Sequence, residues 1–108
     1  MEINEYIEKI HEWARLKGWW DVPRAFPELV ALAHSELSEA LEDYRNGRDC
    51  NETYLEGEKP CGIPSELADL FIRVFDMCGY YNIDLEEALK IKMEYNEKRP
   101  YRHGGKKA

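Results

Sequence analysis

The stretch PSELADLFIRVFDMCGYY, residues 64–81, predicts the centre of the molecule. From Leu67 to Cys78, apolar residues occupy nearly the whole circumference of a helix, and Pro64 suits its first turn, where the missing N–H costs nothing. One polar stripe interrupts them, formed by Glu66, Asp69, Arg73 and Asp76. Because a helix that is apolar nearly all round must be surrounded, we expect the other helices and a second subunit to cover it.

Three further helices are expected, over about residues 2–17, 27–46 and 84–98. Residues 47–62 are polar and rich in Gly and Glu, and are expected to form a long loop without strands. Four helices with short connections predict an all-α fold, an antiparallel four-helix bundle that oligomerisation completes. We expect one domain over residues 1–108, with a basic tail at 100–108.

The composition excludes several classes of function. A formal net charge of −7 argues against a nucleic-acid partner, because such binding depends on Lys and Arg at phosphates. No apolar run reaches transmembrane length, and the acidic start MEINEYIEKI is unlike a targeting signal, so no membrane partner is expected. The three cysteines, Cys50, Cys61 and Cys78, favour reduced thiols in a cytoplasmic protein, with a Cys50–Cys61 disulfide as the lesser alternative.

Two acidic pairs of identical spacing, Glu36-x-x-Glu39 and Glu66-x-x-Asp69, indicate the chemistry. Residues three apart lie on one helix face, and the apolar neighbours of each pair indicate that this face points inward. Four carboxylates in a low-dielectric interior repel one another unless a cation binds them. All-oxygen ligands suit Mg²⁺, with Mn²⁺ as a substitute, so all four residues are candidate metal ligands. The alternative, a solvated acidic face, fits one such pair better than two.

Cationic and amide side chains follow near the C-terminus. Lys92, Asn96 and Arg99 continue an inward stripe of the fourth helix and are candidates to bind phosphate and sugar. A solvated last turn that complements the helix dipole explains them equally well. His103 and Lys106 are candidates for a phosphate clamp, with a disordered basic tail as the alternative.

Other candidates carry less weight. Arg73, one turn after Asp69, could pair with that carboxylate or reach a substrate phosphate, and pairing is favoured. His34 lies off the acidic ridge and suits packing or a base contact better than metal ligation. No Gly-rich phosphate loop, GxSxG or HExxH motif occurs, so covalent nucleophile and zinc-protease chemistries have no support.

Three segments together resemble the MazG-like group of all-α nucleoside triphosphate pyrophosphohydrolases. They are HSELSEALEDYRNG (34–47), GIPSELADLFIRVFDMCG (62–79) and KMEYNEKRPYRHGGKKA (92–108). That superfamily is marked by an ExxE pair and, after a variable loop, an ExxD pair, here with a K-x-x-x-N continuation at Lys92 and Asn96. The sequence departs from many relatives at Ser35, where they carry a further acidic residue.

The resemblance implies Mg²⁺-dependent hydrolysis of a nucleoside triphosphate to the monophosphate and pyrophosphate. It implies that Glu36 and Glu39, besides binding metal with Glu66 and Asp69, are the catalytic carboxylates that activate water. It further implies a homodimer or homotetramer with active sites shared between subunits. Housecleaning of non-canonical nucleotides is the expected role.

Two other functions remain open at this point. A carboxylate-bridged di-metal bundle, acting as an oxidoreductase or a metal store, would normally use Glu-x-x-His pairs, which neither acidic pair provides. A catalytically silent, nucleotide-binding regulatory module would bind nucleotide without turnover.

Overall fold

The computed structural model describes residues 2–100. It is mostly helical, and the element order is α1 (Ile3–Leu16), α2 (Phe26–Arg45), β1 (Tyr54–Glu56), β2 (Lys59–Cys61), α3 (Ile63–Tyr80) and α4 (Leu85–Glu97). The four predicted helices are confirmed, with ends within one residue of expectation. Asp84 caps α4, because its Oδ1 accepts a hydrogen bond from the Glu87 backbone N–H at 3.0 Å.

The expectation of a strandless loop over residues 47–62 is wrong, because β1 and β2 form an antiparallel hairpin. Tyr54 pairs with Cys61 and Glu56 with Lys59, which leaves a two-residue turn whose Gly57 has a φ of 64°. Such turns favour glycine in the left-handed conformation. The strands are short and mostly exposed, so the hydrophobic alternation that usually reveals a strand is missing.

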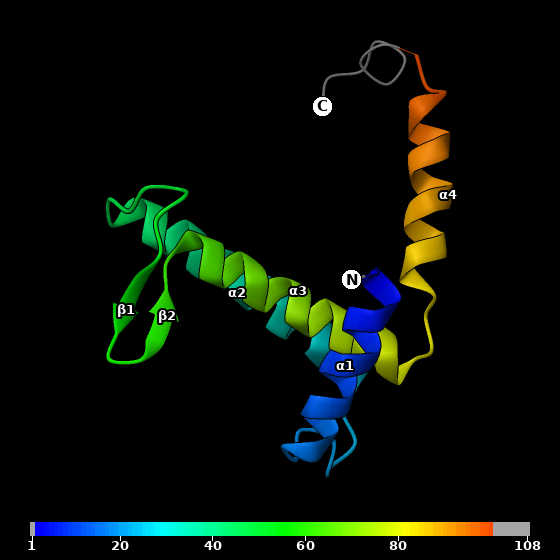
Figure 1. The fold of residues 1–108 in the computed structure, drawn as a ribbon, viewed down its shortest axis with the longest axis horizontal. Helices are drawn as coiled ribbons and strands as arrows, with labels where there is room; N and C mark the ends of the chain where they lie inside the picture. The colour runs from blue at the N-terminus through cyan, green and yellow to red at the C-terminus, as the bar shows by residue number, and fades with distance from the viewer. Residues whose placement is uncertain (1, 101–108) are drawn as a thin grey trace.

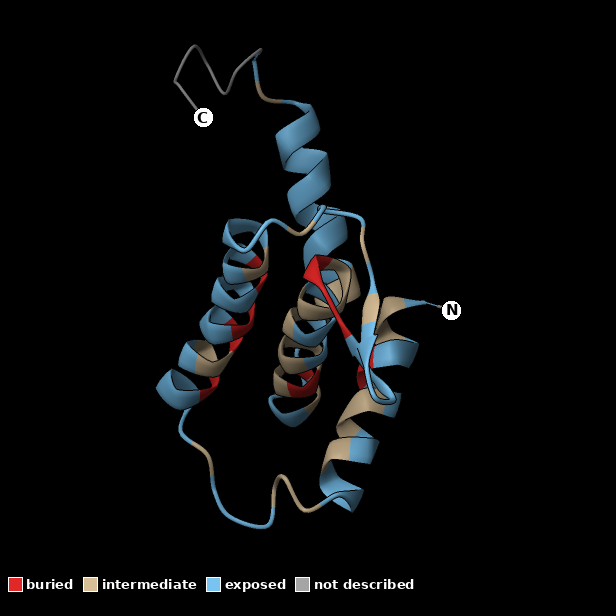
Figure 2. Cartoon of the chain, turned by 90° about the vertical axis from the view of Figure 1, so that its left-hand side faces the viewer, coloured by how far each residue is buried: buried red, intermediate tan, exposed pale blue. Residues whose placement is uncertain are grey.

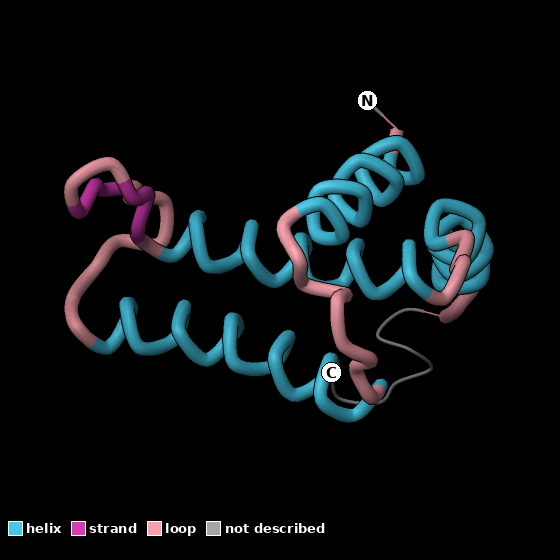
Figure 3. Tube along the Cα trace, turned by 90° about the horizontal axis from the view of Figure 1, so that it is seen from below, coloured by secondary structure: helices cyan, strands magenta, loops and turns pink. Residues whose placement is uncertain are grey.

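Helices α2 and α3 form the centre of the structure. They lie side by side and antiparallel, and the hairpin joins them at one end (Figures 1 and 3). Buried residues of α2 recur at helical spacing, and Figure 2 shows them along one side of the helix. They are Leu29, Ala33, Glu36 and Ala40. The prediction that the acidic face points inward is therefore confirmed for Glu36 alone. Glu66 is half-buried, whereas Glu39 and Asp69 are exposed, so the expectation of four carboxylates in the interior is wrong.

Helix α1 packs across the second half of α3, where a buried polar contact joins them. His11 Nδ1 lies 2.7 Å from Asp76 Oδ1, and the Trp20 indole donates to the same carboxylate at 2.9 and 3.2 Å. Trp20 also stacks on Tyr80, with ring centroids 4.1 Å apart. Trp19 and Trp20, in the segment between α1 and α2, are thus both half-buried within the single chain.

The fourth helix differs most from the sequence prediction. α4 has its main contact with α1 and projects away from the α2–α3 pair, and none of its residues is buried (Figures 1 and 2). Asn82, with a φ of 55°, lies in the turn that directs it there. Within one chain, the predicted inward stripe of α4 is therefore exposed, and α4 does not complete a four-helix bundle. Leu67 and Phe71 of α3 are also exposed.

No helix within residues 2–100 combines the length and the hydropathy that crossing a membrane would require.

Candidate functional site

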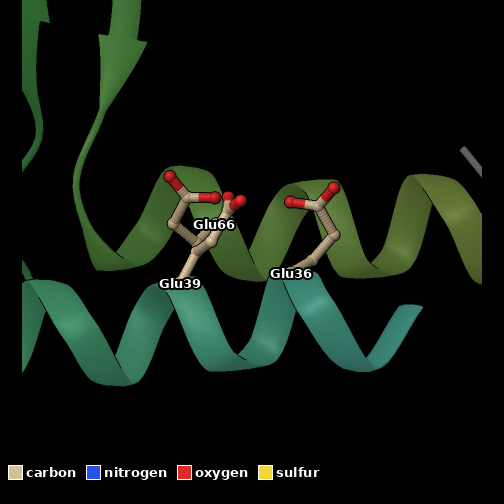
Figure 4. Close-up of side chains that lie close together, drawn as sticks. All are labelled: Glu36, Glu39 and Glu66. Carbon is tan, nitrogen blue, oxygen red and sulfur yellow. The ribbon is translucent and has the colours of Figure 1, made fainter. Parts of the chain in front are cut away.

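Three of the four predicted metal ligands converge between α2 and α3. One carboxylate oxygen each from Glu36, Glu39 and Glu66 lies within 4.8 Å of the other two. Figure 4 shows Glu36 and Glu39 rising from α2 toward α3, which carries Glu66. The convergence follows from the sequence spacing, because residues three apart on α2 present both carboxylates to the antiparallel neighbour.

The start of α3 fixes the position of Glu66. Gly62 precedes the helix with a φ of 114°, and a Cβ there would collide with the backbone oxygen of Glu52. Only glycine fits this close approach without strain. The Glu66 N–H then donates to the Gly62 carbonyl at 3.0 Å, which places Glu66 in the first turn. The loop is further held by the Arg48–Glu52 ion pair at 3.0 Å.

The electrostatics of the cluster are unfavourable without a cation. Burial, and then the adjacent Glu39 carboxylate, raise the pKa of Glu66 to about 7. Glu66 Oε2 is buried and has no hydrogen-bond partner among the described residues. An orphaned buried acceptor among other carboxylates is costly, and native structures leave few of them.

Asp69, the fourth predicted ligand, lies at the edge of this cluster and outside the group of three. Burial and the Glu36 carboxylate raise its pKa, while the cations Arg73 and Lys59 act in the opposite direction. Lys59 comes from β2, a short and mostly exposed strand that has no hydrophobic alternation to mark it in the sequence.

Arg73 contacts the cluster from α3. Its Nε donates to Glu36 Oε1 at 2.8 Å, and the two side chains are 31% and 10% exposed. The sequence favours an ion pair between Arg73 and a carboxylate over a contact with a substrate phosphate. The structure contains such a pair, but the partner is Glu36 on α2 instead of Asp69. The Arg73 guanidinium also lies over the Trp19 ring, with Cζ 5.3 Å from the ring centre.

The structure of one chain does not bring the α4 candidates to the cluster. Lys92 and Arg99 instead flank Tyr95 on α4, at 5.4 and 5.7 Å from its ring. Asn96 is exposed on the same helix, which stands at the opposite end of α3 from Glu66 (Figure 1). His103 and Lys106 lie outside the described residues.

A mostly apolar groove of about 1150 Å³ adjoins the cluster between α1 and α3. Aromatic rings from both helices and the connecting segment line it, as do Glu36, Asp69 and Arg73. Exposed Trp13 and Phe71 stand in its walls. His34 does not take part, since it lies on the outer side of α2 beside Leu37 and Leu41.

The donor set fits a hard divalent cation. It offers carboxylate oxygens alone, within the described residues, and includes the orphaned Oε2 of Glu66. Mg²⁺ and Mn²⁺ prefer such oxygen ligands, whereas sites for zinc or di-iron usually include His or Cys. No protein-family model, curated protein or solved structure matches this chain. The site must therefore be interpreted from its own geometry and from the sequence resemblance.

Proposed function

We propose that this protein is a Mg²⁺-dependent nucleoside triphosphate pyrophosphohydrolase. The observation that supports it best is the convergence of Glu36, Glu39 and Glu66 within 4.8 Å of one another across two helices. The cost of three neighbouring carboxylates is hard to explain in a purely structural role, because the fold gains nothing from their repulsion. The resemblance in the three sequence segments gives the reaction class.

The reaction consumes one water and cleaves the α–β phosphoanhydride, giving a nucleoside monophosphate and pyrophosphate. Glu36 and Glu39 are the proposed catalytic carboxylates, one of which removes a proton from the attacking water. Glu66 and Asp69 complete the proposed ligand set. The chemistry expected of Mg²⁺ here is to neutralise phosphate charge and to make water more acidic.

The groove between α1 and α3 supports a nucleotide as the substrate. Its aromatic lining offers flat apolar surface, and its acidic wall is continuous with the carboxylate cluster. A nucleoside could occupy this space while its phosphates reach the metal ligands. Arg73 stands at the junction and is a candidate phosphate contact.

A second copy of the chain is part of the proposal. Lys92, Asn96 and Arg99 are far from the cluster of their own chain, whereas α4 of another copy could bring them to it. The exposed apolar residues of α3 and α4 also need cover. We therefore propose a homodimer or homotetramer that works in the cytoplasm, with housecleaning of non-canonical nucleotides as its role.

Product analysis with a panel of ribo- and deoxynucleoside triphosphates tests this function. With Mg²⁺ or Mn²⁺, we expect monophosphate and pyrophosphate in equal amounts, and no turnover in excess chelator. Release of orthophosphate, or no turnover of any nucleotide, would contradict the proposal. Tight nucleotide binding without hydrolysis would favour the regulatory module instead.

A further inference from the structure

The ion pair between Arg73 and Glu36 distinguishes one carboxylate of the cluster from the others. Arg73 Nε lies 2.8 Å from Glu36 Oε1, and the Glu36 side chain is only 10% exposed. Among the described residues, neither Glu39 nor Glu66 has such an ion pair. The Arg73 guanidinium therefore already places a positive charge beside the Glu36 carboxylate, which a metal ion would also have to contact.

Trp19 contacts the same guanidinium. The ring centre of Trp19 lies 5.3 Å from Arg73 Cζ, within the range of cation–π attraction. A second guanidinium, that of Arg24, lies 3.8 Å from the same ring. Arg24 Nε also donates to the Trp19 carbonyl at 3.1 Å, which fixes the backbone of this tryptophan.

These contacts form one continuous path from the connecting segment before α2 to the acidic cluster. Arg24 holds Trp19, Trp19 faces Arg73, and Arg73 binds Glu36. A cation so placed lowers the repulsion among the carboxylates. By the same Coulomb interaction it opposes a second cation at the same oxygen atoms.

We propose that Arg73 is a tethered counter-cation, positioned by Trp19, which stabilises the metal-free cluster and weakens its affinity for divalent cations. The inference rests on the proposed metal site but not on any hydrolytic activity. It makes Arg73 a positioning residue for Glu36 and gives the otherwise unexplained Trp19 a role in metal affinity.

The test measures binding of Mn²⁺ alone by electron paramagnetic resonance of the free ion, using the full chain. Arg73→Gln removes the charge and keeps a hydrogen-bond donor, and we expect its Kd for Mn²⁺ to fall roughly three- to tenfold. In excess chelator its Tm should drop by about 4 °C or more. Arg45→Gln is the matched control, because it changes the net charge equally at an exposed ion pair on the surface of α2.

The role of Trp19 is tested with Trp19→Leu against Trp13→Leu. Trp19→Leu should tighten Mn²⁺ binding, whereas Trp13→Leu should not. Because Trp19 acts through Arg73, adding Trp19→Leu to Arg73→Gln should not change the Kd for Mn²⁺ further. Should Arg73→Gln fail to fold, this pair of variants carries the same test.

Unchanged or weaker Mn²⁺ binding by Arg73→Gln, relative to Arg45→Gln, would overturn the inference. So would a wild-type protein that binds no Mn²⁺, which would remove the metal site as well. Mn²⁺ binding with the expected shifts but without nucleotide hydrolysis would leave the inference standing while the proposed function fails.

Discussion

Glu39 on α2 and Glu66 on α3 bring carboxylate oxygens within 4.8 Å of each other, although a hairpin separates them in sequence. The same neighbourhood raises the pKa of Glu66 to about 7. In the unfolded chain, Glu66 loses its proton above the usual pKa of 4.5. In the folded chain, it keeps that proton up to a pH of about 7. Between these two values, folding is linked to proton uptake.

The first prediction concerns the pH dependence of stability without metal. Because the folded state holds more protons, the contribution of Glu66 to stability falls as pH rises from about 4.5 to about 7, and is level above that. Asp69 acts with the same sign, since its pKa is also raised. The Asp84 pKa is lowered from 3.8, so its contribution changes only below this window.

Thermal unfolding in chelator at about pH 5.5, which lies inside this window, and at about pH 8, which lies above it, measures the effect. Glu66→Gln should lose much of the pH dependence that the wild type shows, while Glu12→Gln, an exposed change on α1, should keep it. An identical pH dependence in wild type and Glu66→Gln would contradict the prediction.

The second prediction concerns the ligands themselves. Glu39→Gln or Asp69→Asn should lower turnover at least about 100-fold, because the lost carboxylate binds metal or activates water. Each variant should keep its helical content, and its metal-free form should gain about 1 kcal/mol, since repulsion is relieved. Glu42→Gln is the control, because it removes an exposed carboxylate from α2, the helix that carries Glu39. Near-normal activity in either ligand variant would remove that residue from the site.

The sequence allowed the helices and most of the cluster to be predicted for one physical reason. In a helix, spacing alone determines which side chains share a face, so Glu36 could be oriented from its apolar neighbours Ala33 and Ala40. The pairing of α2 with α3 then brings Glu36, Glu39 and Glu66 together and leaves Asp69 at the edge. The fit of Pro64 and Asp84 to helix starts likewise depends only on local chemistry.

What the sequence did not reveal depends on contacts between distant segments. In the sequence, the Asp76 carboxylate is one more member of the polar stripe of α3, yet in the structure it binds His11 and Trp20 from two other segments. Arg73 could be matched with Asp69 one turn away, but helix packing gave it Glu36. The direction of α4 is set by a short turn at Asn82, which periodicity cannot describe.

The third prediction addresses the buried contact at Asp76. Trp20→Phe keeps the ring on Tyr80 but loses the indole donor to Asp76, and should cost about 1–3 kcal/mol because a buried carboxylate loses one of its two partners and keeps only His11. Trp13→Phe, on the exposed face of α1, should cost less than about 0.5 kcal/mol. Urea unfolding of both variants measures the difference, and equal losses would show that the contact contributes little.

The fourth prediction concerns the entry to α3. Gly62→Ala should destabilise the protein more than Gly47→Ala, although both glycines have positive φ. At Gly47 nothing lies within 4 Å of the methyl group that alanine would add, so only backbone strain of about 1 kcal/mol applies. At Gly62 the methyl group also meets the Glu52 carbonyl, so the loop must move. Comparable unfolding free energies for the two variants would contradict this account.

The last prediction is that the protein is at least a dimer, and that α4 depends on the partner. A helix as short as α4 (13 residues) is marginal in water without tertiary packing, and none of its described residues is buried. Ile91 and Tyr95 are 58% and 52% exposed, so covering each would gain roughly half of the 1.5–3 kcal/mol that full burial of an exposed apolar side chain is worth. We expect light scattering at low micromolar concentration to give a multiple of the chain mass.

Ile91→Glu should shift the protein toward monomer and lower its activity in parallel, whereas Glu94→Gln, also exposed on α4, should change neither. A monomer with full activity would contradict the prediction, because Lys92 and Asn96 would then have no route to the carboxylate cluster.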